Sequence, residues 1–120
     1  MRLDLDLKWD PNSTDVWFTP PYIFDALSID FDLDPAAPPG GVPWVPAKNH
    51  YSEMGDGLSQ PWEGRVWLNP PYSNPQPWIE RLVAHGDGVA LIAADTSTGW
   101  WHHSATSADA FCFLKGEHLW

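Results

Sequence analysis

The sequence contains one cysteine, no long apolar run and few cations, and each shortage excludes a class of protein. Cys112 is the only cysteine among 120 residues, which excludes an internal disulfide and any cysteine-based zinc site. Its surroundings, "AFCFL", favour a buried and unreactive thiol. No apolar run approaches the roughly eighteen residues of a membrane span, and no basic, apolar signal segment follows Met1. We therefore expect a soluble cytosolic protein of one domain.

Positive charge is scarce. Six Lys and Arg oppose sixteen Asp and Glu, which gives a formal net charge of −10. Because cationic side chains normally neutralise a phosphate backbone, this balance predicts weak and strongly salt-dependent binding to nucleic acid. A nucleic-acid enzyme of this composition needs a local basic patch, a partner or a basic segment that this sequence lacks. The nine Trp and thirteen Pro are many for this length, and both can build rigid binding surfaces.

The chain alternates between segments that favour helices and segments that favour strands. Helices are expected at 18–28 with Thr19 as N-cap, at 73–86 with Asn74 as N-cap, and within 96–105. Strands are expected at 29–34, at 64–69, at 109–114, and at 88–94, where a continuous apolar run indicates burial on both faces. Residues 38–47 are rich in Pro and Gly and predict a loop. Residues 1–15 form an acidic leader, either a strand or a solvated segment, and 16–120 form the domain.

Polar segments stand at the ends of three of these strands. They are Asp34-Pro35-Ala36, Asn69-Pro70-Pro71-Tyr72 and Asp95-Thr96-Ser97-Thr98. This order of elements indicates an α/β fold with a mostly parallel sheet, in which ligands bind outside the carboxyl ends of the strands. We therefore expect the three segments to converge on one ligand-binding edge.

Four blocks of the sequence, in this order, resemble the phage-type DNA N6-adenine methyltransferase family. They are "VWFTPPYIFDAL", "FDLDPAA", "DGLSQPWEGRVWLNPPYS" and "LIAADTSTGWWH". The resemblance implies a Rossmann-like fold that binds S-adenosylmethionine, shortened at the C-terminus. It also implies a phage or prophage enzyme that acts on a flipped-out adenine of DNA in the cytoplasm of a bacterial host.

The resemblance assigns roles to individual residues. An adenine amine is a poor nucleophile because its lone pair is delocalised into the ring, and acceptors that grip its N–H groups stabilise the charge that develops on transfer. The Asn69 oxygen and the Pro70 carbonyl would be these acceptors, Pro71 would stiffen the segment, and Tyr72 would stack on the base. The cofactor would lie against Thr19, Pro20, Asp34, Pro35, Ala36 and Asp56. The adjacent His102 and His103 point about 100° apart on a helix, so no metal site is expected.

Two other functions remain open at this point. The acidic charge, Glu117 in place of the family's usual Arg, and an end at Trp120 before further strand material favour a truncated, inactive relative that acts as a binding module. Protein glutamine methyltransferases share the "NPPY" motif, and a DNA-repelling charge favours them slightly. A short sheet would also favour self-association, or binding of a partner that completes the sheet.

Overall fold

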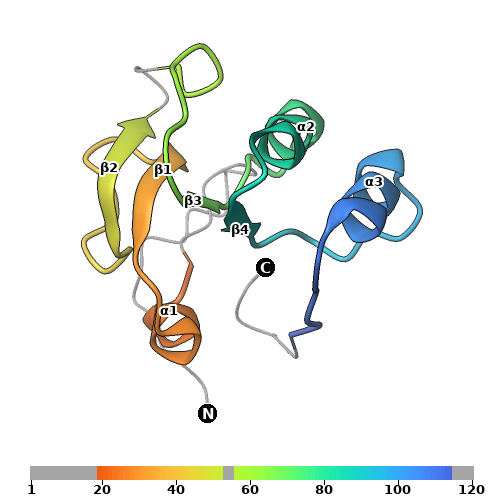
Figure 1. Ribbon diagram of the computed structural model, residues 1–120, viewed down its shortest axis with the longest axis horizontal. Coiled ribbons are helices and arrows are strands. Elements are labelled where there is room, and N and C mark those ends of the chain that lie inside the picture. The colour runs from red at the N-terminus through yellow and green to blue at the C-terminus, as the bar shows by residue number, and fades with distance from the viewer. Residues whose placement is uncertain (1–18, 53–55, 115–120) are drawn as a thin grey trace.

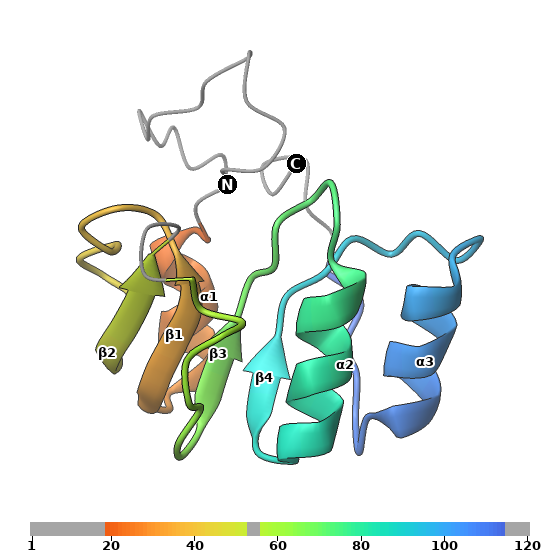
Figure 2. The same ribbon diagram turned by 90° about the horizontal axis from the view of Figure 1, so that it is seen from above.

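The computed structural model describes residues 19–52 and 56–114 as an α/β domain. The acidic leader expected at 1–15 lies outside these residues. The sheet has the order β2-β1-β3-β4, and every neighbouring pair is parallel. The strands are β1 (Phe31–Ala37), β2 (Ala47–Ser52), β3 (Val66–Leu68) and β4 (Gly88–Ala90). Figure 2 shows all four arrows pointing the same way, so their carboxyl ends share one edge.

Helices lie on both faces of this sheet (Figure 1). Under α1 (Pro21–Leu27), one apolar cluster joins Ile23, Phe24, Phe31 and Trp67. Under α2 (Gln76–His85), a second cluster joins Leu33, Trp62, Val66 and Leu68. The third helix, α3 (Gly99–Ser107), packs against α2. No helix of the described residues is long and apolar enough to cross a membrane.

Strand β2 was not predicted, because its residues show no regular alternation of apolar and polar side chains. Its sequence, "AKNHYS", is mostly polar, and its central residues are exposed. Because β2 lies at the edge of the sheet, it needs no buried face, and hydrogen bonds to β1 hold it in place. The neighbouring strand was predicted at 29–34 and instead begins at Phe31 and continues to Ala37.

Two predictions for the C-terminal half were wrong. The run 88–94 was expected to be a strand buried on both faces, but only Gly88–Ala90 is a strand and two of its three residues are exposed. Within the described residues β4 is the last strand of the sheet, so one side of it has no neighbour. Residues 109–114 form no strand, and the side chains of Phe111 and Phe113 are 63% and 65% exposed. Cys112 is therefore exposed, contrary to the burial expected from its apolar neighbours.

Neither predicted side-chain cap of the first two helices is present. The N-cap residues are Pro20 and Pro75, and no side chain caps either helix. Each helix also has Pro at N1 or N2, which has no N–H to satisfy. The predicted helix end at Gly86 is confirmed, since this residue has φ 83°, the left-handed conformation that glycine adopts without strain. Thr19 is therefore available for another contact.

Candidate active site

The order of the strands places a switch point between β1 and β3. From β1 the chain passes outward to β2 and then returns across β1 to β3 on its other side. In parallel sheets, ligands bind beyond the carboxyl ends at such a point. The connections from β3 to α2 and from β4 to α3 both run along this edge (Figure 2). Two cavities, of about 210 and 150 Å³, contain residues of these strand ends and connections.

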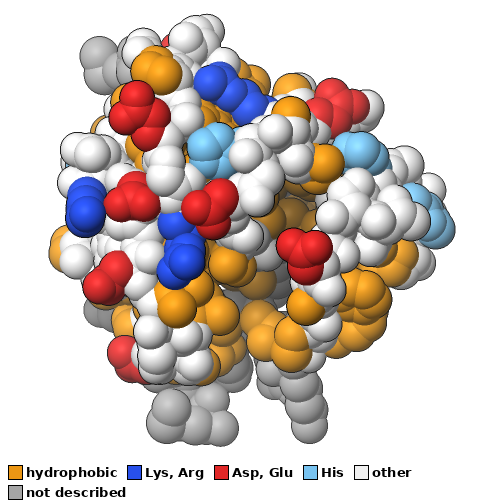
Figure 3. Space-filling model, in the orientation of Figure 1, with side chains coloured by type: hydrophobic (Ala, Val, Ile, Leu, Met, Phe, Trp, Pro, Cys, Tyr) orange, Lys and Arg blue, Asp and Glu red, His pale blue; other side chains and the backbone are white. Residues whose placement is uncertain are grey.

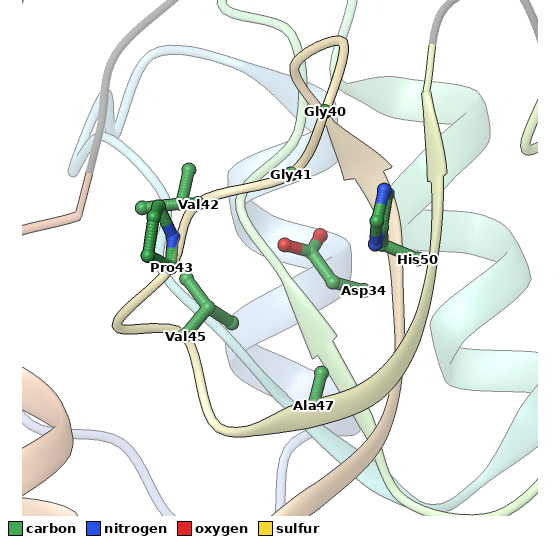
Figure 4. Close-up of a pocket in the computed structure, with 8 residues that line it drawn as sticks. All are labelled: Asp34, Gly40, Gly41, Val42, Pro43, Val45, Ala47 and His50. Atoms are coloured by element: carbon green, nitrogen blue, oxygen red, sulfur yellow. The ribbon is translucent and has the colours of Figure 1, made fainter.

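The larger cavity, called the acid cavity below, is enclosed by β1, β2 and the loop between them (Figure 4). In Figure 4 the Asp34 carboxyl points into the space under the loop that carries Gly41 and Val42, and His50 flanks it from β2. Asp34 and His50 are register partners on the two parallel strands. The lining residues are Asp34, Gly40, Gly41, Val42, Pro43, Val45, Ala47 and His50.

Asp34 is a buried carboxyl with little to stabilise its charge. Asp34 is only 6% exposed, and burial raises the pKa of its carboxyl to about 7. The Ala36 N–H donates to Asp34 Oδ1 at 3.4 Å and lowers the pKa, which offsets only part of the burial effect. No metal-binding group of three or more His, Cys, Asp or Glu exists among the described residues. A cationic ligand in this cavity would supply the missing counter-charge.

The smaller cavity, called the amide cavity below, combines an amide, hydroxyl groups and aromatic rings. The segment after β3 contributes Asn69, Pro70 and Tyr72, and Tyr72 is 52% exposed. A turn closed by the Asn74 N–H on the Pro71 carbonyl, 3.3 Å away, presents Tyr72. The complete lining is Asn69, Pro70, Tyr72, Ser73, Pro75, Leu91, Ile92, Ala93, Asp95, Thr98 and Trp100. At about 150 Å³ it is smaller than the roughly 300–1,000 Å³ of drug-sized sites.

Thr19 connects the two cavities. Asn69 donates from Nδ2 to Thr19 Oγ1 at 3.2 Å, which fixes the rotation of the amide and leaves Oδ1 on its opposite side. Trp44, in the loop over the acid cavity, donates from Nε1 to the Thr19 carbonyl at 2.7 Å. Thr19 itself is only 4% exposed. This threonine was predicted to cap a helix, and the structure uses it to orient Asn69.

The segment that follows β2 lies against the end of β1. A Cβ placed on Gly57 would fall 1.9 Å from the Pro35 carbonyl oxygen, so the backbone can approach this closely only at glycine. The neighbouring residue Asp56 is exposed, and its Oδ2 accepts from Ser59 Oγ at 2.6 Å. Asp56 lines neither cavity, but Gly57 holds it beside the carboxyl end of β1.

Contacts from α2 fix this segment. Arg81 donates to the carbonyls of Leu58 and Gln60, and its guanidinium lies over the Trp62 ring, 4.8 Å from the centroid. Trp62 in turn donates from Nε1 to the Gly57 carbonyl at 2.8 Å. The Arg81 side chain is therefore used to hold backbone, although the protein has few cations.

The structure brings only part of the predicted site together. Asn69, Pro70 and Tyr72 line the amide cavity, and Asp34 lines the other one. Thr19 lines neither cavity and contacts the amide cavity only through its hydrogen bond with Asn69. The remaining predicted residues do not line either cavity: Pro20 and Pro35 are fully buried, Ala36 supports Asp34 through its N–H, and Pro71 is half-buried. Sequence reasoning did not assign Gly40, Gly41 and His50 to the site, although the delayed glycine pair after "DPAAPP" signals a close backbone approach.

Comparison with known proteins agrees with the resemblance. The family profile described as DNA N-6-adenine-methyltransferase (Dam) matches residues 8–119. A protein of Haemophilus phage HP1 (strain HP1c1) named DNA N-6-adenine-methyltransferase is 30% identical over 115 residues, covering 88% of this chain and 65% of the relative. A protein of the same name from Escherichia phage T1 is 28% identical over 112 residues, covering 86% of this chain and 46% of the relative. The chain thus spans less than two thirds of each relative's length. No solved structure gives a significant match.

Proposed function

The chain belongs to the DNA N-6-adenine-methyltransferase (Dam) family, and from this membership we propose that it transfers a methyl group from S-adenosylmethionine to the N6 amine of adenine in DNA. The observation that carries the proposal is Asn69, whose amide is oriented by Thr19 at the wall of a small cavity beside the exposed Tyr72 ring. The four-stranded parallel sheet, with its switch point between β1 and β3, supports a Rossmann-like fold for this purpose.

The amide cavity would hold the reacting base by its amino edge. Because Asn69 Nδ2 already donates to Thr19, its Oδ1 would accept one N–H of the adenine amine, and the Pro70 carbonyl would accept the other. Two acceptors favour a more pyramidal nitrogen and stabilise the positive charge that develops on it during transfer. The Tyr72 ring would stack on a base that has swung out of the duplex.

The acid cavity would hold the amino-acid end of the cofactor. S-adenosylmethionine supplies an activated methyl group on a sulfonium, so the protein needs chiefly to position it in line with the amine. Its ammonium group would lie beside the Asp34 carboxyl, which is buried and lacks a counter-charge among the contacts that raise or lower its pKa. The loop through Gly40 and Gly41 would cover this end of the cofactor, and a Cβ on Gly41 would fall 3.0 Å from the His50 ring, so glycine is needed there. Asp56 and Gly57 would flank the adenosine end beyond β1.

The described cations do not form a DNA-binding patch. Lys48 pairs with Asp32 at 3.4 Å, Arg65 lies 3.8 Å from Asp87, and Arg81 donates to loop carbonyls. On the face in Figure 3, the Lys and Arg side chains lie among Asp and Glu side chains. DNA would therefore be held weakly, through the flipped base and a partner or second copy that supplies positive charge. We expect the methylation reaction to take place in the cytoplasm of a bacterial host.

Titration of S-adenosylmethionine into the protein tests the cofactor site, and its pH dependence tests Asp34. The ammonium binds the charged carboxylate, so a free pKa of about 7 means that affinity rises as pH rises. We expect about a fivefold gain between pH 6 and pH 7.5 by calorimetry, followed by a decline as the cofactor's own α-amino group loses its proton at roughly 7.7–8.0. His50 lines the same cavity, so His50→Gln is the matched control and should keep the gain. Equal affinity of wild type and Asp34→Ala at every pH would refute the assignment.

A further inference from the structure

Trp100 lines the amide cavity from a different part of the chain than Tyr72. Tyr72 follows β3, whereas Trp100 is in the first turn of α3, beyond β4. Between them the residues after β4, Leu91, Ile92 and Ala93, line the same cavity with apolar side chains. The cavity is therefore lined by an aromatic residue from each of two separate segments, by apolar residues and by Asn69.

A network of short contacts fixes the position of Trp100. The Thr98 hydroxyl caps α3 by accepting from the Trp101 N–H at 3.3 Å, and it donates to the Asp95 carbonyl at 2.7 Å. Asp95 Oδ1 accepts from the Ser97 hydroxyl at 2.7 Å. One turn later, the Ser104 hydroxyl donates to the Trp100 carbonyl at 2.7 Å. The turn that leads into α3 thus holds the tryptophan at the cavity wall.

Trp100 is not part of the buried core. The helix α3 buries none of its residues, and this half-buried tryptophan lines the cavity. The next residue, Trp101, is equally half-buried, packs edge-on against His102 at 5.3 Å, and does not line the cavity. The two neighbouring tryptophans therefore have different environments, and only Trp100 faces the space where the base would lie.

We propose that Trp100 is a second base-stacking residue, which holds the flipped adenine between its indole and the Tyr72 ring. The inference rests on the proposed function and adds a specificity-determining contact to it. A slot with two aromatic walls and an amide acceptor selects a flat heterocycle with an amino edge. The second wall also restricts the base to the plane in which its amine meets Asn69, so the ring positions the nucleophile as well as binding it.

Alanine and phenylalanine variants of Trp100, with Trp101→Ala as the matched control, test this role. The assay is labelled methyl transfer to methylation-free genomic DNA, with calorimetric affinity for S-adenosylmethionine and thermal melting measured alongside. Loss of one stacking ring should raise the KM for DNA roughly 5- to 150-fold in Trp100→Ala and leave cofactor affinity unchanged. Trp100→Phe should restore most of the loss because it keeps a ring. Trp101→Ala should keep the wild-type KM.

The outcomes separate this inference from the proposed function. Wild type that methylates DNA, together with a Trp100→Ala variant whose KM matches that of Trp101→Ala, overturns the stacking role alone. Wild type that transfers no methyl group refutes the proposed function. In that case a fluorescent single-stranded adenine oligonucleotide is the probe, and anisotropy should show at least fivefold weaker binding by Trp100→Ala than by Trp101→Ala. Equal binding by the two variants, or no binding by wild type, overturns the stacking role.

Discussion

Replacing Asn69 with alanine should lower methyl transfer on the order of a hundredfold to a thousandfold while cofactor affinity stays near that of wild type. The loss corresponds to roughly 2.7–4 kcal/mol, the usual effect of removing one preorganised polar contact to a reacting centre. The structure supplies the preorganisation, since Thr19 Oγ1 accepts from Asn69 Nδ2 and sets the direction of the amide oxygen. Asn69→Asp should retain more activity than the alanine variant because a carboxylate still accepts hydrogen bonds.

Asn74→Ala is the matched control for this experiment. The same type of side chain is removed five residues further along the segment, where Asn74 is exposed and lines neither cavity. Thermal melts separate chemistry from folding, because Asn69→Ala also loses the contact with Thr19. If Asn69→Ala folds and methylates as fast as Asn74→Ala, the segment is only a rigid turn and the proposed clamp is wrong.

The second large effect concerns stability. Burial raises the pKa of Asp34 from 3.8 to about 7, so the folded protein holds a proton there that the unfolded chain releases. The resulting stabilisation is complete below pH 3.8 and is lost as pH rises through about 7. Relative to Asp34→Asn, wild type should therefore lose roughly 2–3 kcal/mol of unfolding free energy between pH 5 and pH 8, at about 1.4 kcal/mol per pKa unit.

Urea denaturation of both proteins at the two pH values measures this difference directly. Asparagine can still accept the Ala36 N–H through its amide oxygen, so the variant keeps the contact and loses only the titration. His50→Gln serves as the control for the neighbouring imidazole, and the comparison with Asp34→Asn is repeated in that background. A difference between wild type and Asp34→Asn that is the same at pH 5 and pH 8 would show that Asp34 keeps an ordinary pKa.

The sequence predicted those parts of the fold in which local pattern and tertiary role agree. The apolar stretch before Asn69 forms β3, Gly86 ends α2, and a helix expected within 96–105 is present as α3. The parallel sheet with polar strand ends also followed from the order of elements. At each of these places the local sequence pattern and the tertiary contacts favour the same structure.

The errors arose where tertiary position overrides local pattern. Strand β2 is polar because it lies at an edge, so no periodicity revealed it. The apolar segment 109–114 suggested a strand, but the described sheet ends at β4, and strand propensity alone does not create a pairing partner. Thr19 has the composition of a helix cap, and only the fold shows that its hydroxyl meets Asn69, fifty residues later. Asp34 is likewise separated from the amide cavity because its own cavity is lined by β1, β2 and the loop between them, whereas the amide cavity is lined by the segments after β3 and β4.

Adenine methylation by this chain is tested most simply by incubating wild type with methyl-labelled S-adenosylmethionine and methylation-free DNA. The labelled nucleoside is then identified after complete digestion. Label is expected in N6-methyladenine, at a yield that falls as salt is raised because few cations hold the DNA. Cofactor binding without any label in adenine would contradict adenine methylation by this chain and identify it as an inactive relative that binds the cofactor.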